Sequence, residues 1–151
     1  MKLAEALMIR ADLQKEIHGM ERRILANVKG QEDDEPVEDV EKLLPQYAAL
    51  METLESLIVK INNTNSATVF GDTTLSAAIT RRDSLKKRIG VYRDIYTTAV
   101  EREGRYSRSE IKYVRYVDAK KIRFMIDGLS KDLRELDIGI QSFNWTVDLM
   151  E

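Results

Sequence analysis

The chain of 151 residues contains no cysteine, one histidine and two prolines. Without cysteine, it forms no disulfide, no thiolate nucleophile and no cysteine-based zinc or iron–sulfur site. One histidine is too few for a di-iron bundle of the ferritin type, which uses a Glu-x-x-His motif on each of two helices. We interpret His18 as an ordinary side chain at a helix interface, and we predict no metal and no cofactor.

Long apolar runs are also missing. No stretch approaches the roughly 18 apolar residues of a membrane span. Glu5 and Arg10 interrupt the apolar region that a signal peptide would need near its start. We therefore expect a cytoplasmic protein without a membrane span.

Motifs of catalysis and ligand binding are absent as well. The seven glycines form no phosphate-binding motif, and no serine lies in a nucleophile elbow where His18 could assist it. The acidic run at residues 32–35 lacks the alternating ligand positions and the turn glycine of an EF-hand calcium loop, so we interpret it as a solvated loop. We assign no catalytic residue and predict a protein that is not an enzyme.

Charge, by contrast, is abundant and unevenly distributed. Charged residues make up 33% of the chain, with a net charge of −2. Residues 31–55 carry nine acidic side chains and one basic, whereas residues 81–123 carry fourteen basic and six acidic. Because opposed charges on neighbouring helices fix their orientation, we expect the two segments to face each other in the fold or across a dimer. The alternative is a basic surface that binds a polyanion.

Apolar residues recur at alternating spacings of three and four along four segments. This period indicates helices at about residues 2–28, from Pro45 in a first turn to 61 or 62, from Thr73 or Thr74 to about 103, and from a cap at Asp118 onward. The last helix has the most regular seam, at Ile122, Ile126, Leu129, Leu133, Leu136, Ile140, Phe143, Val147 and Met150. We predict an all-α fold in one domain, residues 1–151, as an antiparallel bundle of long helices or coiled-coil hairpins.

Two arginines, Arg10 and Arg82, occupy seam positions where apolar residues are expected. A polar seam residue can set the register of a bundle, and an arginine can bury its stem while its charged end reaches the edge. The alternative is an inward-facing anion or carboxylate site, in which a buried arginine needs a partner. Asp83, Asp94 or an acid of the second helix are the candidate partners.

The segments between helices contain the remaining polar candidates. Residues 62–68 are rich in Asn, Ser and Thr, which compete for backbone hydrogen bonds, so we predict that the second helix ends there and that Gly71 and Asp72 form a turn. Residues 105–117 are ambiguous, because their tyrosines and valines favour a strand while Ser107 and Glu110 resemble a capping box. We predict an extended segment that pairs with residues 68–70 in a very short two-stranded ladder.

The part of this segment from Arg105 to Arg115 mixes basic and aromatic side chains. Such a mixture can hold a single-stranded nucleic acid or another phosphate ligand. Tyrosines in an extended segment more commonly pack against a bundle. A phosphate- or nucleic-acid-binding module is therefore an alternative function.

Several runs resemble the septicolysin-like family of small bacterial helical proteins, over nearly the whole chain. They are residues 6–15 (ALMIRADLQK), 31–36, 61–65 (INNTN), 74–76, 82–83, 105–112, 133–137 (LRELD) and 144–146 (NWT). The resemblance implies binding-site candidates among polar residues near helix ends and loops: Asn62, Asn65, Arg108, Ser109, Glu110, Lys112, Asn144 and Trp145. The family name implies a cytolysin-like, membrane-active protein, a further alternative against which the missing export segment argues.

Helices of this length do not bury their apolar stripes fully within one small chain. We therefore expect a homo-oligomer, with a dimer favoured, and a further protein partner is compatible with it. The leading interpretation is a non-enzymatic, self-associating interaction protein.

Overall fold

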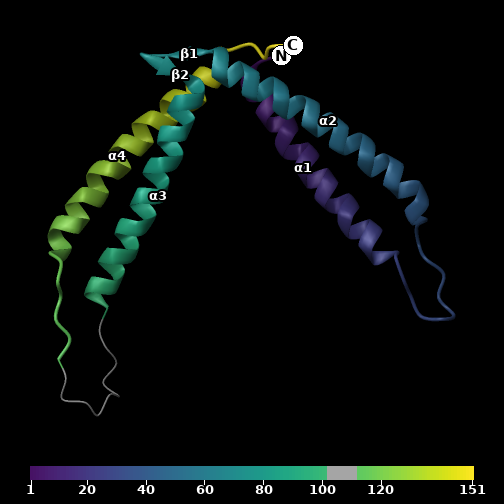
Figure 1. Cartoon of the computed structure of the whole chain (residues 1–151), viewed down its shortest axis with the longest axis horizontal. Helices are drawn as coiled ribbons and strands as arrows, with labels where there is room; N and C mark the ends of the chain where they lie inside the picture. Colours follow the sequence, from purple (N-terminus) through teal and green to yellow (C-terminus); the bar gives the residue numbers. More distant parts are fainter. Residues whose placement is uncertain (102–111) are drawn as a thin grey trace. The chain divides into compact units, whose positions relative to one another are not determined.

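The computed structural model of the chain describes residues 1–101 and 112–151, which form four long helices and one very small sheet (Figure 1). The helices are α1 (Leu3–Ala26), α2 (Val40–Ala67), α3 (Leu75–Val100) and α4 (Ala119–Asn144). The strands are β1 (Val69–Phe70) and β2 (Thr73–Thr74). The predicted all-α class, with one short two-stranded ladder, is confirmed.

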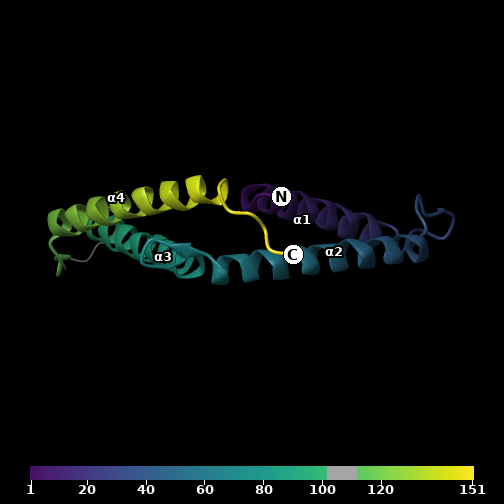
Figure 2. The same ribbon diagram turned by 90° about the horizontal axis from the view of Figure 1, so that it is seen from above.

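The chain divides into two compact units. Unit 1 comprises Met1–Ser76 together with Gln141–Glu151, and unit 2 comprises Ala77–Ile140. Each unit is built on a pair of helices, α1 beside α2 in unit 1 and α3 beside α4 in unit 2, as Figures 1 and 2 show. The last turn of α4 belongs to unit 1.

The core of unit 1 follows the predicted apolar spacing. Its buried residues at intervals of three, seven or eleven, which keep to one helix face, include Leu3, Ala6, Ile17 and Met20 on α1 and Leu43, Leu54, Ile61 and Thr64 on α2. The hydroxyl of Tyr47 donates to Glu21 Oε1 across the pair at 3.4 Å. At the start of α2, Asp39 Oδ1 accepts a hydrogen bond from the backbone N–H of Glu41 at 3.0 Å, which satisfies one of the free donors of the first turn.

Unit 2 has a thinner core of the same kind. Its buried apolar residues are Ala78, Leu85 and Ile89 on α3 and Ile126 and Ile140 on α4. Arg123 of α4 lies over the ring of Tyr96 of α3, 5.6 Å from the ring centroid. The predicted cap at Asp118 is confirmed, since its Oδ1 accepts from the backbone N–H groups of Lys120 and Lys121 at 3.0 and 3.2 Å.

The predicted end of α2 near Asn62 is wrong, because the helix continues to Ala67. The threonines of this stretch do not compete with the helix. Thr64 Oγ1 donates to the carbonyl of Lys60 at 2.7 Å, and Thr68 Oγ1 donates to the carbonyl of Thr64 at 2.6 Å. Bonds to the carbonyl four residues back are compatible with a continuing helix.

The start of α2 also differs from the prediction. The helix begins at Val40, so Pro45 lies inside it rather than in its first turn. Pro45 lacks an N–H and therefore removes the bond to the carbonyl of Glu41, which is exposed and close to the helix start.

The strand pairing predicted for residues 105–117 is wrong for the described residues 112–117, which form no strand. β1 pairs with β2, antiparallel, with Val69 opposite Thr74 and Phe70 opposite Thr73. Residues 112–118 form neither helix nor strand, and residues 102–111 lie outside the described part of the chain. The pairing of β1 with β2 across a two-residue turn is favoured because closing a short loop costs less chain entropy than closing a long one.

The turn between β1 and β2 uses Gly71 in the left-handed region, at φ +63°. Of the residues that the structure describes, no non-glycine residue has a positive φ, so Asp72 does not. A two-residue hairpin loop with only its first residue at positive φ is typical of a type II′ turn, which favours glycine there.

The C-terminal segment departs from the predicted seam. α4 ends at Asn144, and Val147 and Met150 therefore lie beyond the helix. The backbone of the last residues turns back to pair with the start of the chain, where Leu3 N–H donates to the carbonyl of Val147 and Leu149 N–H donates to that of Met1, both at 2.9 Å. Two backbone bonds with a distant segment thus replace further helical turns.

Candidate interaction surface

A second row of apolar residues runs along α2 beside its core-facing seam. Leu44, Met51 and Ile58 recur at intervals of seven, one position past the seam. Leu44 is 49% exposed, Met51 is 39% exposed and Ile58 is half-buried. We call these three residues the α2 stripe. A helix with a wide apolar face is expected to cover that face with another element, and α1 covers only part of it.

A shallow acidic groove of about 490 Å³ opens on α2 next to this row. Its lining residues, which define the α2 groove, are Glu52, Glu55, Ser56, Val59, Lys60, Asn63 and Glu151. This set contains three carboxylate side chains and one ammonium group. Glu52 and Glu55 are exposed, and within the described part of the chain neither has an ion-pair partner. The groove therefore presents uncompensated negative charge beside an apolar row.

α3 in unit 2 presents the opposite charge. Five exposed basic side chains have no ion-pair partner among residues 1–101 and 112–151; these α3 cations are Arg81, Lys86, Lys87, Arg88 and Arg93. Asp94, a predicted partner for a seam arginine, is exposed on the same helix. The surface of α3 is therefore strongly basic.

Arg82, the polar seam residue of α3, differs from its basic neighbours. Its guanidinium contacts Asp83 Oδ1 at 2.9 Å and Asp137 Oδ1 of α4 at 3.7 Å. Asp83 was among the predicted partners, but Asp137 was not, since the sequence does not show which acid lies opposite. Two carboxylates around one half-buried arginine fit a residue that joins α3 to α4.

Arg10, the polar seam residue of α1, is half-buried in unit 1. Its Nε is buried and has no hydrogen-bond partner among the described residues. Nε is buried without a hydrogen bond, yet the residue as a whole is half-exposed. This is consistent with a side chain whose stem packs along the seam while its charged end reaches the edge.

The two ends of the described chain meet around the last turns of α2. Lys2 Nζ contacts Asp148 Oδ1 at 2.9 Å and donates to the carbonyl of Thr146 at 3.1 Å. Hydrogen bonding and charge from Lys2 hold the pKa of the Asp148 carboxyl below its usual value. Nearby, Phe70 and Phe143 meet edge to face with ring centroids 5.2 Å apart, a favoured arrangement of aromatic pairs.

Four of the predicted site residues lie in unit 1. Asn62 is exposed and Asn65 is half-buried, and both lie within α2 rather than in a turn. Asn144 ends α4, and its Oδ1 is buried without a hydrogen-bond partner among the described residues. Trp145 follows it and is exposed.

The other predicted site residues lie elsewhere. Lys112 is exposed in the irregular stretch before α4 in unit 2. The 26 residues of α4, about 39 Å at 1.5 Å per residue, separate it from Asn144 along the chain. Arg108, Ser109 and Glu110 lie outside the described residues. Beside Lys112, Tyr113 and Tyr116 are exposed, Tyr116 at 96%, so these tyrosines are not packed against the helices.

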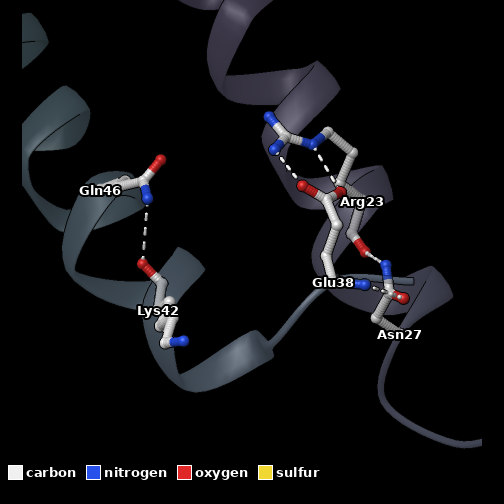
Figure 3. A network of polar contacts seen from close by, with 5 residues as sticks. All are labelled: Arg23, Asn27, Glu38, Lys42 and Gln46. Atoms are coloured by element: carbon white, nitrogen blue, oxygen red, sulfur yellow. Dashed lines mark hydrogen bonds and ion pairs between the residues drawn. The ribbon is translucent and has the colours of Figure 1, made fainter. Parts of the chain in front are cut away.

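An ion pair that the sequence did not indicate closes the loop between α1 and α2 (Figure 3). Arg23 Nε donates to Glu38 Oε2 at 2.9 Å, and a second N–H of the guanidinium donates to the other carboxylate oxygen. The hydrogen bonds from Arg23 lower the pKa of Glu38. Asn27 connects the same residues, accepting from Glu38 N–H at 3.0 Å and donating to the carbonyl of Arg23 at 2.8 Å. The acidic loop is thus anchored at both ends.

The anchored loop encloses a second hollow, of about 510 Å³, lined by parts of residues 26–37. Asp34 and Glu35 supply its carboxylates and Lys29 its ammonium group. In the described part of the chain, no group of three or more His, Asp or Glu side chains is placed to hold a metal ion, and no helix is long and apolar enough to cross a membrane.

The chain is similar to known proteins along almost its whole length. A crystal structure of a functionally unknown conserved protein from Corynebacterium diphtheriae is 39% identical, with a TM-score of 0.90 over 99% of both chains. No curated protein matches the chain. The family model of a family of unknown function, DUF6847, matches residues 10–149. The chain therefore belongs to the DUF6847 family.

Proposed function

We propose that this protein is a non-enzymatic, cytoplasmic interaction protein that self-associates through its helices. The observation that supports this proposal is the α2 stripe, three apolar residues at heptad spacing that α1 leaves partly uncovered. Positions beside the seam of a two-helix pair are those that a third or fourth helix covers in a bundle. A second copy of the chain supplies such helices.

The magnitude of this burial bears on the size of the interface. Full burial of a Leu, Ile or Met side chain contributes about 1.5–3 kcal/mol, so covering three partly exposed ones contributes roughly 2–4 kcal/mol. A micromolar dimer needs about 8 kcal/mol in total. The α2 stripe is therefore the centre of a larger contact. Other exposed apolar side chains are available on α4, namely Phe124, Met125 and Ile138.

Analytical ultracentrifugation tests the proposal directly. The wild-type chain is expected to sediment at twice its mass of 17.4 kDa at micromolar concentration. Met51→Glu places a charge in the α2 stripe and is expected to shift the protein toward monomer. Met8→Glu is the matched control, because Met8 is also exposed but lies on α1, away from its seam. A wild-type chain that stays monomeric at all concentrations up to about 100 μM contradicts the proposal. That limit corresponds to a binding free energy of roughly 5.5 kcal/mol.

A second candidate function rests on the exposed residues that precede α4. Lys112, Tyr113, Arg115 and Tyr116 are all exposed, an arrangement suited to stacking on bases and contacting phosphates. Fluorescence anisotropy with single-stranded DNA and RNA at low salt tests this function, and binding is expected to weaken steeply as salt rises. Tyr116→Ala should weaken binding, whereas Tyr92→Phe on α3 should not. Absence of binding at about 50 μM protein, where even typical non-specific complexes form, removes this candidate.

A further inference from the structure

We propose that the α2 groove receives the α3 cations of a second copy of this chain, so that two copies dock reciprocally. This inference rests on the proposed self-association and names its partner surface. The occupant of the acidic groove is thus a basic helix that the chain itself provides.

The net charges of the two units are opposite. Unit 1 contains 16 acidic and 8 basic residues, a net charge of −8, and unit 2 contains 16 basic and 10 acidic residues, a net charge of +6. Contacts between like units of two copies would bring like charges together, which disfavours them. Contacts between unit 1 of one copy and unit 2 of the other bring opposite charges together. The charge distribution therefore selects the reciprocal arrangement.

Both surfaces carry charged side chains that have no ion-pair partner among the described residues. Elsewhere the described chain neutralises many of its charges internally, as in the pairs Lys2–Asp148 and Arg23–Glu38. By contrast, Glu52 and Glu55 of the α2 groove and the five α3 cations have no ion-pair partner in the described ranges. Each surface thus offers the charge that the other lacks.

Basic side chains on α3 repeat at intervals of seven, as do the apolar residues of the α2 stripe. Lys86 and Arg93 are seven residues apart beside the α3 seam, and Arg81 and Arg88 are seven apart on its other side. These are the flanking positions whose charges determine partner choice and orientation in coiled coils. Lysine and arginine stems cover apolar surface while their charged ends reach a carboxylate. Lys86 and Arg93, which lie on one side of the α3 seam, can therefore cover part of the α2 stripe and neutralise the adjacent groove together.

Reciprocal docking also closes the assembly. If unit 1 of each copy receives unit 2 of the other, the dimer contains two equivalent contacts and leaves no matching surface free. A single unreciprocated contact would leave one acidic and one basic surface open and would extend into longer assemblies. A mass of two copies, without larger species, is therefore the expected result.

Two charge-reversed variants test the inference. The acid-reversed variant carries Glu52→Lys and Glu55→Lys, and the base-reversed variant carries Lys86→Glu and Arg93→Glu. Each variant alone places like charges opposite each other at the altered positions of both contacts, and is expected to dimerise at least about tenfold more weakly. In an equimolar mixture, the heterodimer pairs the two altered surfaces with each other and the two native surfaces with each other, so wild-type affinity is expected to return.

The control variant carries Glu16→Lys and Glu32→Lys, which change the net charge by the same amount at exposed positions outside the α2 groove. It is expected to dimerise like the wild type. Circular dichroism of every variant checks that the helices are retained.

The outcomes separate the two levels of the proposal. A monomeric wild type overturns the self-association and this inference together. A wild-type dimer whose affinity does not respond to the reversals overturns this inference alone, and leaves the α2 stripe to explain the association. A single chain that carries all four reversals, Glu52→Lys, Glu55→Lys, Lys86→Glu and Arg93→Glu, separates contacts within a chain from contacts between chains. If this chain recovers affinity but mixing the two variants does not, the groove is filled by α3 of the same chain, and the inference is wrong.

Discussion

The hydroxyl oxygen of Thr64 accepts a hydrogen bond from the backbone N–H of Met150 at 3.0 Å, across 86 residues of the chain. The same hydroxyl donates to the carbonyl of Lys60 at 2.7 Å. Thr64 is completely buried, so neither bond is replaced by water if it is lost. The C-terminal segment is thus attached to α2 through one side chain, in addition to its backbone pairing with Lys2.

Replacing Thr64 by valine keeps the shape of the side chain and removes its hydroxyl. The Met150 N–H then loses its acceptor, and we expect the free energy of unfolding to fall by about 1–3 kcal/mol. Urea unfolding measures the loss, and amide hydrogen exchange should show faster exchange at Met150. Thr53→Val is the control, because Thr53 is exposed and its hydroxyl bonds only to the carbonyl of Ala49. Equal effects of the two substitutions would contradict the role of the Met150 bond.

Two isoleucines of α4 allow the contribution of core packing to the free energy of unfolding to be measured separately from that of helix propensity. Ile140 is 1% exposed and Ile138 is 59% exposed, although they are two residues apart. Ile140→Ala should leave a cavity and lower the free energy of unfolding by about 2–5 kcal/mol. Ile138→Ala should change it by less than about 0.5 kcal/mol. Thermal or urea unfolding of both variants measures these two changes. A small effect of Ile140→Ala would mean that α4 does not pack as described.

Arg82 is expected to stabilise the α3–α4 pair through both of its carboxylate contacts. Arg82→Ala removes the contacts and the packed stem, and should lower the free energy of unfolding by about 1–3 kcal/mol. Arg82→Met, which keeps most of the stem, should cost less. The neighbouring Arg81→Ala is the control and should stay within about 0.5 kcal/mol, since Arg81 is exposed. A loss for Arg81→Ala as large as for Arg82→Ala would refute the assignment.

The carboxyl groups of Glu38 and Asp148 make the free energy of unfolding depend on pH in the acid range. Arg23 lowers the pKa of Glu38, and Lys2 lowers the pKa of Asp148. A carboxyl whose folded pKa lies below its unfolded value, about 4.3 for Glu and 3.9 for Asp, stabilises the fold above the unfolded value. That contribution is lost as the pH falls through the folded pKa. We therefore expect the free energy of unfolding to decrease below about pH 4.

Glu38→Gln isolates one of these two groups. The variant should unfold more easily at neutral pH than the wild type, and the gap should close as the pH falls. Urea unfolding at several pH values between about 3 and 7, spanning the carboxyl range, measures this. Glu35→Gln, in the same loop but outside the Arg23 contact, should follow the wild-type profile. A gap for Glu38→Gln that stays constant with pH would contradict the assigned titration.

The positions of the helix seams followed from the sequence alone. Intervals of three and four align side chains on one face of a helix, and water drives that face inward. Asp118 was predicted as a cap because its short side chain reaches nearby N–H groups, and Gly71 was predicted in a turn. These features depend on interactions within a few residues, which the local sequence contains.

The predicted site residues illustrate the limit of such local reasoning. Residues 62–65 have the composition of a turn, but Thr64 is held in the helix by bonds to Lys60 and to Met150. The pairing of Val69 and Phe70 with Thr73 and Thr74 was not predicted, because strand propensity does not say which segment will be the partner. The pairing of Arg23 with Glu38 could not be inferred at all, since it depends on the course of the loop between them.

The sequence by itself determined that this chain forms long amphipathic helices, where their apolar faces lie, and that its acidic and basic side chains are segregated. Only the tertiary structure decided where α2 and α4 end, which strands pair, and which acids Arg23 and Arg82 contact. It also showed that Met51 on α2 stays partly exposed beside an acidic groove. The reason is physical: periodicity acts within one helical turn, whereas caps, strand partners and ion pairs depend on segments that only folding brings together.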